Sequence, residues 1–537
     1  MSSVILVGMP GVGKSTVGRE LAQVLDLPFR DLDLLFEERH GRTPAEVIRA
    51  DGEEAFRRAE TNLIAEVVTG PPSVIATGGG AVESPVARWH LWHAGPVVWL
   101  DAPDHVLHNR LSTDSTARPL TATAEQLAAR RDKRLPFYRA ADIHVDSSTQ
   151  SERLARHLAD RLTDLTRATQ DATPGRMLFY SKVRRDHPMG PREAVISFAD
   201  RFPQSFLTRT IAERSTGSPV IVVDQNVILA QPTFTAQLAG DRRFALEAGE
   251  QRKRLQVAEE LLEFAASARA ERADAWIAAG GGTTGDLVGT AAALYMRGAP
   301  LIQMPTTWLA MSDAAIGGKV AVDLEAAKNS AGAFWPPVAV LADVATLSTL
   351  SRDLLLDGMG ETLKSGLIGD PWLWDLVRDR GSAALDVEAP DWAARYAMVE
   401  RSAVLKLGVV ERDPFEDGER RHLNLGHTIG HALEIESGYT LSHGRAVVLG
   451  LRAVAHMARA RGGRADLAEE IDDVVGSLGF DLTRRFDAAR VKEALAGDKK
   501  SHRGRIRWVL PMDVGVMEQA NDITEDELDA ALAHITE

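Results

Sequence analysis

Two hydrophobic patterns alternate along the first two thirds of the chain. Short apolar runs, for example 4–7, 74–77, 220–223 and 276–279, have the length of buried strands. Between such runs, apolar residues recur every three or four positions, as they do in the helix predicted over 17–25. Strands that alternate with helices in this way predict α/β domains, in which helices cover both faces of a mainly parallel sheet.

From about residue 345 onward the pattern becomes almost entirely helical. The stretch 423–435 repeats its apolar residues with a period near 3.6, which predicts a buried helix. The apolar positions are Leu423, Leu425, Ile429, Ala432, Leu433 and Ile435. His427 and His431 lie four residues apart in this stretch, so both would project from one face of the helix.

Histidines spaced in this way bind a divalent metal ion in other His-x-x-x-His helices. The alternative is that both are core histidines with unrelated hydrogen-bond partners. His443 and a carboxylate upstream in the sequence favour the metal site. Because the chain has no cysteine, a metal must bind His, Asp or Glu side chains, and no disulfide can form.

The composition is that of an ordinary soluble globular protein, with 45% apolar and 26% charged residues. A length of 537 residues predicts two or three domains. No run approaches the roughly 20 apolar residues of a membrane span, and no signal peptide precedes the strand at 4–7, so we expect a cytoplasmic protein. The net charge of −14 argues against nucleic-acid binding and predicts that anionic small molecules are bound by locally gathered positive charge.

The segment Gly8–Thr16 (GMPGVGKST) connects the first strand with the first helix. Its glycines allow backbone N–H groups to face phosphate oxygens, while Lys14 would reach the β- and γ-phosphates and the Ser15 hydroxyl would bind Mg²⁺. The segment therefore predicts a site for ATP with Mg²⁺. The predicted nucleotide-binding residues are Gly11, Val12, Gly13, Lys14, Ser15 and Thr16.

Several polar motifs follow this loop at the ends of predicted strands or in later segments. They are Asp31 and Asp33, Phe56–Glu60, Gly78–Gly80, Thr116–Leu120 and Arg134–Arg139. Together with the phosphate loop they resemble shikimate kinase over residues 1 to about 165, and 1–165 is the predicted kinase domain.

The kinase resemblance assigns a role to each motif. It implies that Asp33 binds the hydroxyls of the acceptor as a catalytic residue, next to Lys14, and that Arg57 and Arg139 hold its carboxylate beside Gly79. It also implies that Asp31 lies near the Mg²⁺, and that Arg118, on a lid, reaches the phosphates as a further catalytic and nucleotide-binding residue.

Residues 166–179 carry Thr, Asp, Pro and Gly without periodicity and predict a linker. A second α/β pattern starts at about 180. Its strand at 276–279 runs into Gly280–Asp286, where glycines suit a close approach to a pyrophosphate, although this is not the Rossmann fingerprint.

The motifs from 180 to 537 resemble 3-dehydroquinate synthase in order and spacing. They are Tyr295–Gly298, Gln303–Thr307, Asp313, Gly317–Lys319, Lys328–Asn329, Gly360–Ile368, Lys406, Asp413–Glu416, Arg420, the histidine helix and Asp498–Lys500. The resemblance implies an NAD-binding α/β domain at 180–344 and a helical metal and substrate domain at 345–537.

The resemblance implies a site for Zn²⁺ or Co²⁺ with Glu361, His427 and His443 as ligands. His431 then faces the substrate, whereas helical spacing alone would make it the second ligand. The implied catalytic residues are Lys319, Lys364, Lys406 and His431. The implied substrate-binding residues are Arg297, Asp313, Lys319, Asn329, Lys364, Lys406, Glu416, Arg420, Asn424, His431 and Lys499 or Lys500. The implied NAD-binding residues are Asp224, Asn226, Glu250, Lys253, Gly281, Gly282, Asp286, Thr306, Thr307, Lys319 and Lys328.

The two resemblances imply a bifunctional enzyme of aromatic biosynthesis. The first half would phosphorylate shikimate. The second would convert 3-deoxy-D-arabino-heptulosonate 7-phosphate to 3-dehydroquinate and phosphate with recycled NAD⁺, as a homodimer. Two features depart from the synthase pattern: Arg445 replaces a usual Glu, and the stretch before Val220 matches poorly.

Three alternatives remain open. The second half could be another sugar-phosphate cyclase or an iron-dependent alcohol dehydrogenase, but neither needs the carboxylate-binding pair Lys406 and Arg420. One half could be a non-catalytic scaffold, but no phosphate loop, lysine or metal ligand is missing.

Overall fold

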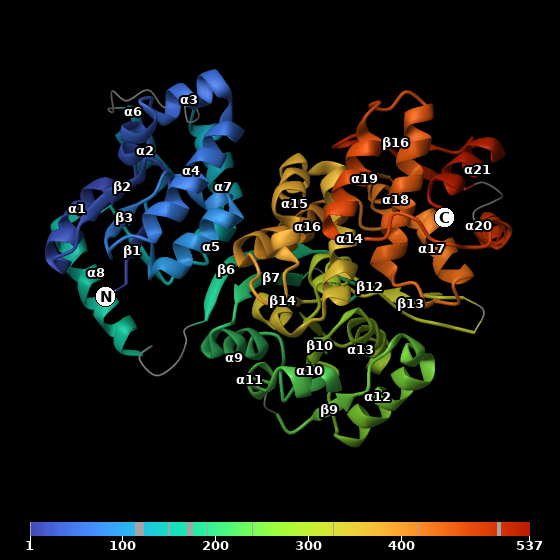
Figure 1. The fold of residues 1–537 in the computed structure, drawn as a ribbon. Coiled ribbons are helices and arrows are strands. Elements are labelled where there is room, and N and C mark those ends of the chain that lie inside the picture. The colour runs from blue at the N-terminus through green and yellow to red at the C-terminus, as the bar shows by residue number, and fades with distance from the viewer. Residues whose placement is uncertain are drawn as a thin grey trace. The chain divides into compact units, whose positions relative to one another are not determined.

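The computed structural model describes residues 2–112, 123–148, 151–168, 175–190, 192–238, 240–325, 327–416, 418–501 and 506–537. The chain divides into two compact units. The first comprises Met1–Val183 with Val195–Leu207, and the second comprises Arg184–Ala194 with Thr208–Glu537. Figure 1 labels the elements of both units.

The first unit contains a five-stranded parallel sheet of order β2-β3-β1-β4-β5. Its strands are β1 (Val4–Val7), β2 (Phe29–Asp31), β3 (Val74–Ala76), β4 (Val97–Asp101) and β5 (Ile143–Asp146). Its helices are α1 (Lys14–Leu25), α2 (Leu32–His40), α3 (Pro44–Asp51), α4 (Glu53–Val68), α5 (Pro85–Ala94), α6 (Asp104–Ser112), α7 (Ala124–Tyr138) and α8 (Ser151–Ala168), with a 3₁₀ turn at Ala81–Glu83. Because β1 is the central strand, all four of its residues are buried, which explains the continuous apolar run at 4–7.

The segment predicted as a linker, 166–179, contains regular structure at both ends. Helix α8 continues to Ala168, and strand β6 (Arg176–Arg185) begins eight residues later. Residues 169–174 lie outside the described part of the chain. Within 166–179 the structure therefore describes the end of α8, Gly175 and the start of β6.

A second, seven-stranded sheet has the order β6-β7-β14-β11-β10-β8-β9. Its other strands are β7 (Arg192–Asp200), β8 (Val220–Asp224), β9 (Arg243–Leu246), β10 (Trp276–Gly280), β11 (Leu301–Pro305) and β14 (Ala339–Asp343). The helices of this region are α9 (Gln204–Ala212), α10 (Gln225–Ala230), α11 (Pro232–Ala236), α12 (Leu255–Ser267) and α13 (Gly282–Leu294), and β12 (Lys319–Val322) pairs with β13 (Ala331–Phe334) as a hairpin. Helix α12 begins at Leu255, after a 3₁₀ turn at Glu250–Arg252.

The region after residue 350 is mainly helical, as predicted. Its helices are α14 (Arg352–Gly369), α15 (Pro371–Ala384), α16 (Trp392–Arg412), α17 (His427–Glu436), α18 (His443–Ala460), α19 (Leu467–Leu478), α20 (Ala488–Ser501) and α21 (Glu525–His534). A β-hairpin, β15 (Trp508–Asp513) with β16 (Val516–Ala520), interrupts the helices. The predicted helix at 423–435 is α17, which starts only at His427, and Ile435, predicted as buried, is 47% exposed.

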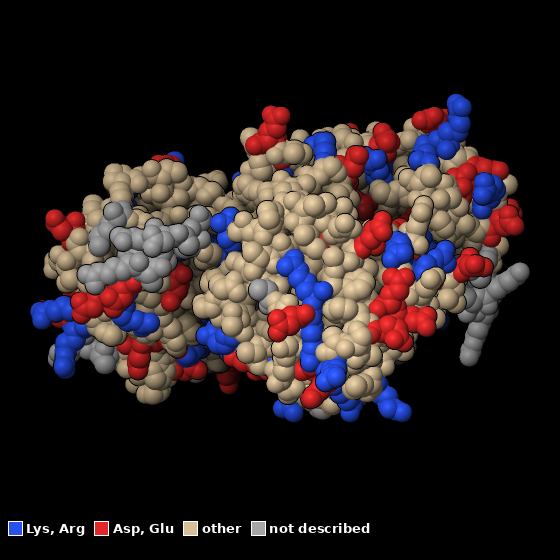
Figure 2. Space-filling view, turned by 90° about the horizontal axis from the view of Figure 1, so that it is seen from below, with Lys and Arg blue, Asp and Glu red and all other residues tan. Residues whose placement is uncertain are grey.

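Among the described residues, none of the helices combines the length and apolar character needed to cross a lipid bilayer. On the face drawn in Figure 2, acidic and basic side chains are interspersed over the described surface.

Candidate active sites

The phosphate loop folds as its glycines require. Gly11 and Gly13 adopt φ values of 81° and 95°, in the left-handed region that favours glycine. Gly13 precedes α1, so the free N–H groups at the start of that helix face the loop and favour an anion there. Lys14 Nζ donates hydrogen bonds to the carbonyls of Gly8 (2.8 Å) and Met9 (3.1 Å), which places its ammonium group inside the loop.

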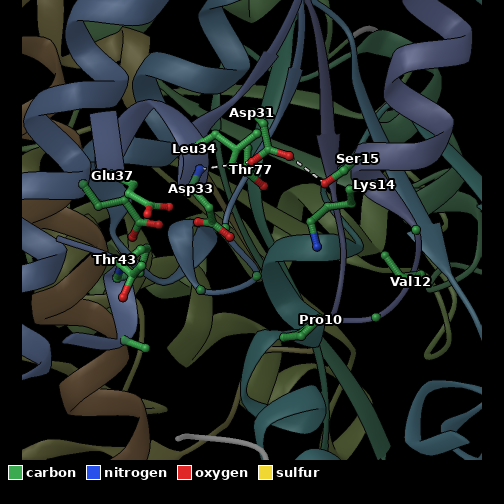
Figure 3. Close-up of a pocket in the computed structure, with 18 of the residues that line it drawn as sticks. Pro10, Val12, Lys14, Ser15, Asp31, Asp33, Leu34, Glu37, Thr43 and Thr77 are labelled. Atoms are coloured by element: carbon green, nitrogen blue, oxygen red, sulfur yellow. Dashed lines mark hydrogen bonds between the residues drawn. The ribbon is translucent and has the colours of Figure 1, made fainter. Parts of the chain in front are cut away.

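An oxygen pair suited to Mg²⁺ lies beside this lysine (Figure 3). Ser15 Oγ donates to Asp31 Oδ2 at 2.6 Å, and Asp31 Oδ1 accepts from the backbone N–H of Asp33 at 3.2 Å. A hydroxyl and a carboxylate are the kinds of oxygen ligand that Mg²⁺ prefers, so the residues fit the ion. Asp31 therefore joins the phosphate loop to Asp33.

One cavity of about 1120 Å³ is lined by this group and by the predicted acceptor residues Asp33, Arg57 and Gly79. Arg57 is paired with Glu60 (2.6 Å) and Glu53 (3.1 Å). A Cβ atom at Gly80 would overlap the Arg57 guanidinium group, so a larger residue here would require the arginine to shift.

Arg139, predicted to bind the acceptor carboxylate, is not brought to this cavity, and its role stays a prediction. Arg139 is exposed at the C-terminal cap of α7 and does not line the cavity. Arg134, five residues earlier, is buried, lines the cavity and donates from Nε to Glu83 at 2.8 Å. Burial raises the pKa of Glu83, but Arg134 and Lys133 outweigh it and lower that pKa to about 2.

Arg134 was missed because the sequence motif contains both arginines and does not fix which one faces inward. The signal that could have identified Arg134 was Tyr138, which follows it by one helical turn. The Tyr138 hydroxyl donates to the carbonyl of Gly79 at 2.9 Å. The other predicted kinase residue, Arg118, lies outside the described residues.

The three predicted ligands of the second half come together from three helices. His427 and His443 are the first residues of α17 and α18, and their Nε2 atoms lie 3.3 and 3.2 Å from Oε1 of Glu361 in α14. Bonds of 2.0–2.1 Å to a tetrahedral zinc ion give ligand–ligand distances of roughly 3.3 Å. The residues therefore fit a divalent ion with one coordination position left open.

Glu361 is held as a carboxylate, because Lys364 and His427 lower its pKa well below the ordinary value although burial raises it. Lys364, one turn later on α14, is ion-paired with Glu361. It also lies 3.8 Å from Asp313, which pairs with Lys406 at 2.7 Å. A chain of alternating charges thus leads away from the metal group.

Glycines allow the three helices to approach backbone to backbone. A Cβ atom at Gly360 would lie 2.5 Å from the carbonyl oxygen of Gly444, and one at Gly430 would lie 3.0 Å from that of Ala446. A Cβ at Gly450 would overlap the carbonyl of Gly426. Gly360, Gly426 and Gly444 each adjoin a ligand in sequence, so the main chains of the three helices approach closely beside the ligands.

Glu434 is a functional candidate that the sequence reasoning missed. Its Oε1 lies 3.6 Å from His443 Nδ1, on the side of the ring opposite Glu361. A carboxylate in this position orients a metal-binding imidazole and fixes its tautomer. The signal was its position seven residues after His427, two turns along the same face of α17.

His431 follows His427 by one turn, with 5.2 Å between ring centroids. It lines a cavity of about 410 Å³ together with Glu416 and Asn424, which are joined by a hydrogen bond of 2.8 Å. Burial and the neighbouring His427 lower the pKa of His431 to about 3, so its ring is neutral at physiological pH. His431, Glu434 and His443 also form a possible metal-binding group, which leaves two candidate ligand sets around His443.

The predicted substrate residues converge at Gly317. Arg420 donates to its carbonyl at 3.1 Å, and a Cβ there would lie 3.3 Å from Lys406 Cε. Lys319 is ion-paired with Glu416 in the same region.

Four predicted substrate residues are not placed at this group. Asn329 instead accepts a hydrogen bond from Lys253 at 2.6 Å, among the predicted cofactor residues. Arg297 is exposed in the turn Tyr295–Arg297. Lys499 and Lys500 belong to α20, but their side chains lie outside the described residues.

The predicted cofactor residues surround the start of α13, where Gly281 and Gly282 lie. Lys253 Nζ is 2.6 Å from Asp286 Oδ2 and 2.6 Å from Asn329 Oδ1, and Lys328 pairs with Glu250 at 2.7 Å. Asp224 accepts hydrogen bonds from the Thr284 hydroxyl at 3.4 Å and from the backbone N–H of Asn226. Thr306 is buried, and Thr307 lies next to Gly281.

Arg445, the residue that departs from the synthase pattern, pairs with Asp353 at 2.7 Å.

Family models match three consecutive segments of the chain. Residues 10–163 match shikimate kinase, 243–357 match the N-terminal region of 3-dehydroquinate synthase, and 358–501 match its C-terminal region. The chain belongs to the shikimate kinase and 3-dehydroquinate synthase families. It is an enzyme with a kinase half and a synthase half, and the predicted fold classes of both halves are confirmed.

The synthase half has relatives of two kinds. A 2-epi-valiolone synthase of Actinosynnema mirum is 36% identical over 351 residues, 64% of this chain and 91% of that protein. A 3-dehydroquinate synthase of Symbiobacterium thermophilum is 40% identical over 295 residues, 53% of this chain and 80% of that protein. Among solved structures, ValA (2-epi-5-epi-valiolone synthase) from Streptomyces hygroscopicus, with NAD⁺ and Zn²⁺ bound, is 28% identical and has a TM-score of 0.58, covering 63% of this chain and 96% of its own.

Proposed function

We propose that the kinase half transfers the γ-phosphoryl group of ATP to shikimate. The observation that supports this most directly is that one cavity is lined both by Lys14, Ser15 and Asp31 and by Asp33 and Arg57. Phosphoryl transfer needs placement and charge neutralisation more than a covalent group, and these residues supply both.

In this proposal Lys14 exchanges its bonds to loop carbonyls for phosphate oxygens, and Ser15 and Asp31 hold Mg²⁺. Asp33 accepts a hydrogen bond from the attacking hydroxyl, and Arg57 binds the carboxylate of the acceptor. Arg134 replaces Arg139 as the second arginine at the carboxylate, because it is the one that lines the cavity.

The two arginines on α7 give a matched test. Arg134→Met should raise KM for shikimate by about 10–100-fold, because a hydrogen bond to a charged group contributes roughly 1.5–3 kcal/mol. Arg139→Met should leave KM within about twofold of wild type. Coupled ADP assays on both variants, with circular dichroism to verify folding, decide the assignment, and the opposite ranking would restore Arg139.

We propose that the synthase half converts 3-deoxy-D-arabino-heptulosonate 7-phosphate to 3-dehydroquinate and phosphate. The supporting observation is the close group Glu361, His427 and His443, one turn from the cavity-lining His431. When bound, NAD⁺ supplies reversible hydride transfer and Zn²⁺ or Co²⁺ acts as a Lewis acid.

The residues of the chain would act as follows. Glu361, His427 and His443 hold the metal, and Glu434 orients His443. Lys406 and Arg420 bind the substrate carboxylate near Gly317, while Lys319, Asn329 and Lys364 meet its phosphate and hydroxyls. The neutral ring of His431 accepts or passes a proton.

A second candidate function is favoured by the identity of 36% with a 2-epi-valiolone synthase. In that case the synthase half would cyclise a related sugar phosphate without a carboxylate. The deciding experiment compares phosphate release from the heptulosonate phosphate and from the same phosphorylated sugar lacking the carboxylate. The first proposal requires that kcat/KM be at least tenfold higher for the substrate with the carboxylate. It also requires that Arg420→Met lose this preference. Faster release from the neutral sugar would establish the second candidate.

Three further assignments belong to this proposal. We place the domain boundaries near 165, 180 and 345, the enzyme in the cytoplasm, and a homodimer contact in the synthase half. Size-exclusion chromatography with light scattering on the full chain tests the dimer.

A further inference from the structure

Tyr439 has an unusual backbone conformation close to the metal group. It lies in the turn between α17 and α18, four residues before His443, with a φ of 63°. The preceding Gly438 has a φ of 61°, which glycine adopts freely, but a bulky side chain rarely occupies this left-handed region. A strained residue of this kind persists where its surroundings hold it.

The ring of Tyr439 contacts the ammonium group of Lys328, with 4.1 Å from Nζ to the ring centroid. This is a cation–π contact. The same Nζ lies 2.7 Å from Glu250 Oε1, and Glu250 Oε2 accepts a hydrogen bond from Thr283 Oγ1 at 3.3 Å. Because Thr283 directly follows the glycines that begin α13, Lys328 connects the tyrosine turn to the proposed nucleotide site.

The backbone of the same turn is tied to the metal group. Tyr439 N–H donates to the carbonyl of Glu434 at 2.8 Å, and the Glu434 carboxylate lies 3.6 Å from His443 Nδ1. A metal on Nε2 of His443 requires a neutral ring, whose Nδ1–H then faces Glu434. Glu434 therefore lies between the backbone of this turn and His443.

We propose that Tyr439 is a positioning residue that holds Lys328 between the metal group and the nucleotide site, so that metal occupancy and NAD⁺ affinity depend on each other. The inference rests on the proposed synthase function, because it requires that this half bind both. Coupling of this kind is reciprocal: if the metal tightens NAD⁺ binding, NAD⁺ tightens metal binding by the same factor.

The test is NAD⁺ titration by calorimetry on the full chain, first stripped of metal by a chelator and then reloaded with Zn²⁺. In wild type, Zn²⁺ should tighten NAD⁺ binding several-fold. Tyr439→Leu removes the aromatic ring but keeps an apolar side chain. It should weaken NAD⁺ binding by roughly two- to fivefold, the range of an exposed cation–π contact. It should also remove the response to Zn²⁺.

Two further variants separate the ring from the backbone. Tyr439→Phe keeps the ring and should behave as wild type, whereas Tyr439→Gly relieves the strained φ, loses the ring and should behave as Tyr439→Leu. Equal NAD⁺ affinities in wild type and Tyr439→Leu, with and without Zn²⁺, would overturn the inference, as would a loss in Tyr439→Phe equal to that in Tyr439→Leu. Failure of wild type to bind NAD⁺ in either state would instead refute the proposed function itself.

Discussion

His427→Ala should lose its metal, whereas His431→Ala should keep about one ion per chain and lose most synthase turnover. If Glu361, His427 and His443 are the ligands, removal of His427 leaves two protein ligands and opens the site to water. His431 would contribute only a hydrogen bond or a proton transfer to the substrate. Such groups contribute ~10²–10⁴-fold, so the loss should appear mainly in kcat.

Metal analysis of the two purified variants after dialysis, together with phosphate release, measures this difference. His422→Ala is a suitable control, because His422 lies in the 3₁₀ turn just before α17 and has no assigned role. The alternative group of His431, Glu434 and His443 makes the opposite prediction. Metal loss from His431→Ala with retention in His427→Ala would establish that alternative, and loss from both would show that the i, i+4 pair binds the ion.

Lys14→Ala should abolish ADP formation with shikimate and leave phosphate release from the heptulosonate phosphate unchanged. The ammonium of Lys14 lies inside the phosphate loop, and no other side chain of the loop carries a positive charge. Its removal leaves the developing charge on the transferred phosphoryl group without this countercharge. We expect at least a thousandfold loss of kinase kcat.

His427→Ala serves as the reciprocal control, because it should lose phosphate release and retain ADP formation. Both reactions are followed on the same full-length preparations, with thermal denaturation curves to confirm folding. A large loss of both activities in a folded Lys14→Ala protein would show that the two halves do not work independently.

The sequence predicted a motif well where the chemistry of the motif depends on the conformation of its own backbone. The left-handed φ values at Gly11 and Gly13 favour glycine, so the loop could be predicted together with its function. The group of Glu361, His427 and His443 was identified only through the family resemblance. Helical spacing alone selected His431, because the period shows which residues share one face of a helix. It does not show which residues of other helices lie opposite that face.

Side-chain direction and exposure were less predictable. Arg134 and Arg139 are five residues apart and so differ by about 140° around a helix, and α7 ends between them at Tyr138. Ile435 fits the apolar period of α17 but lies at its last turn, where the helix leaves the core. The hairpin of β15 and β16 was missed because only tertiary packing distinguishes its short apolar segments from helical ones.

The glycine contacts among α14, α17 and α18 have a consequence for how this centre can evolve. The close approach of these main chains limits how far the helices that carry the donor atoms can move relative to one another. A Cβ atom at Gly360, Gly426 or Gly450 would lie within 2.8 Å of a main-chain carbonyl oxygen, so two helices would have to shift together with the donors that they carry. Selection for a different ion therefore can change the distances between the ligand atoms only slightly. It can act through the identity of the donor atoms and of neighbours such as Glu434, while the framework that carries them stays the same.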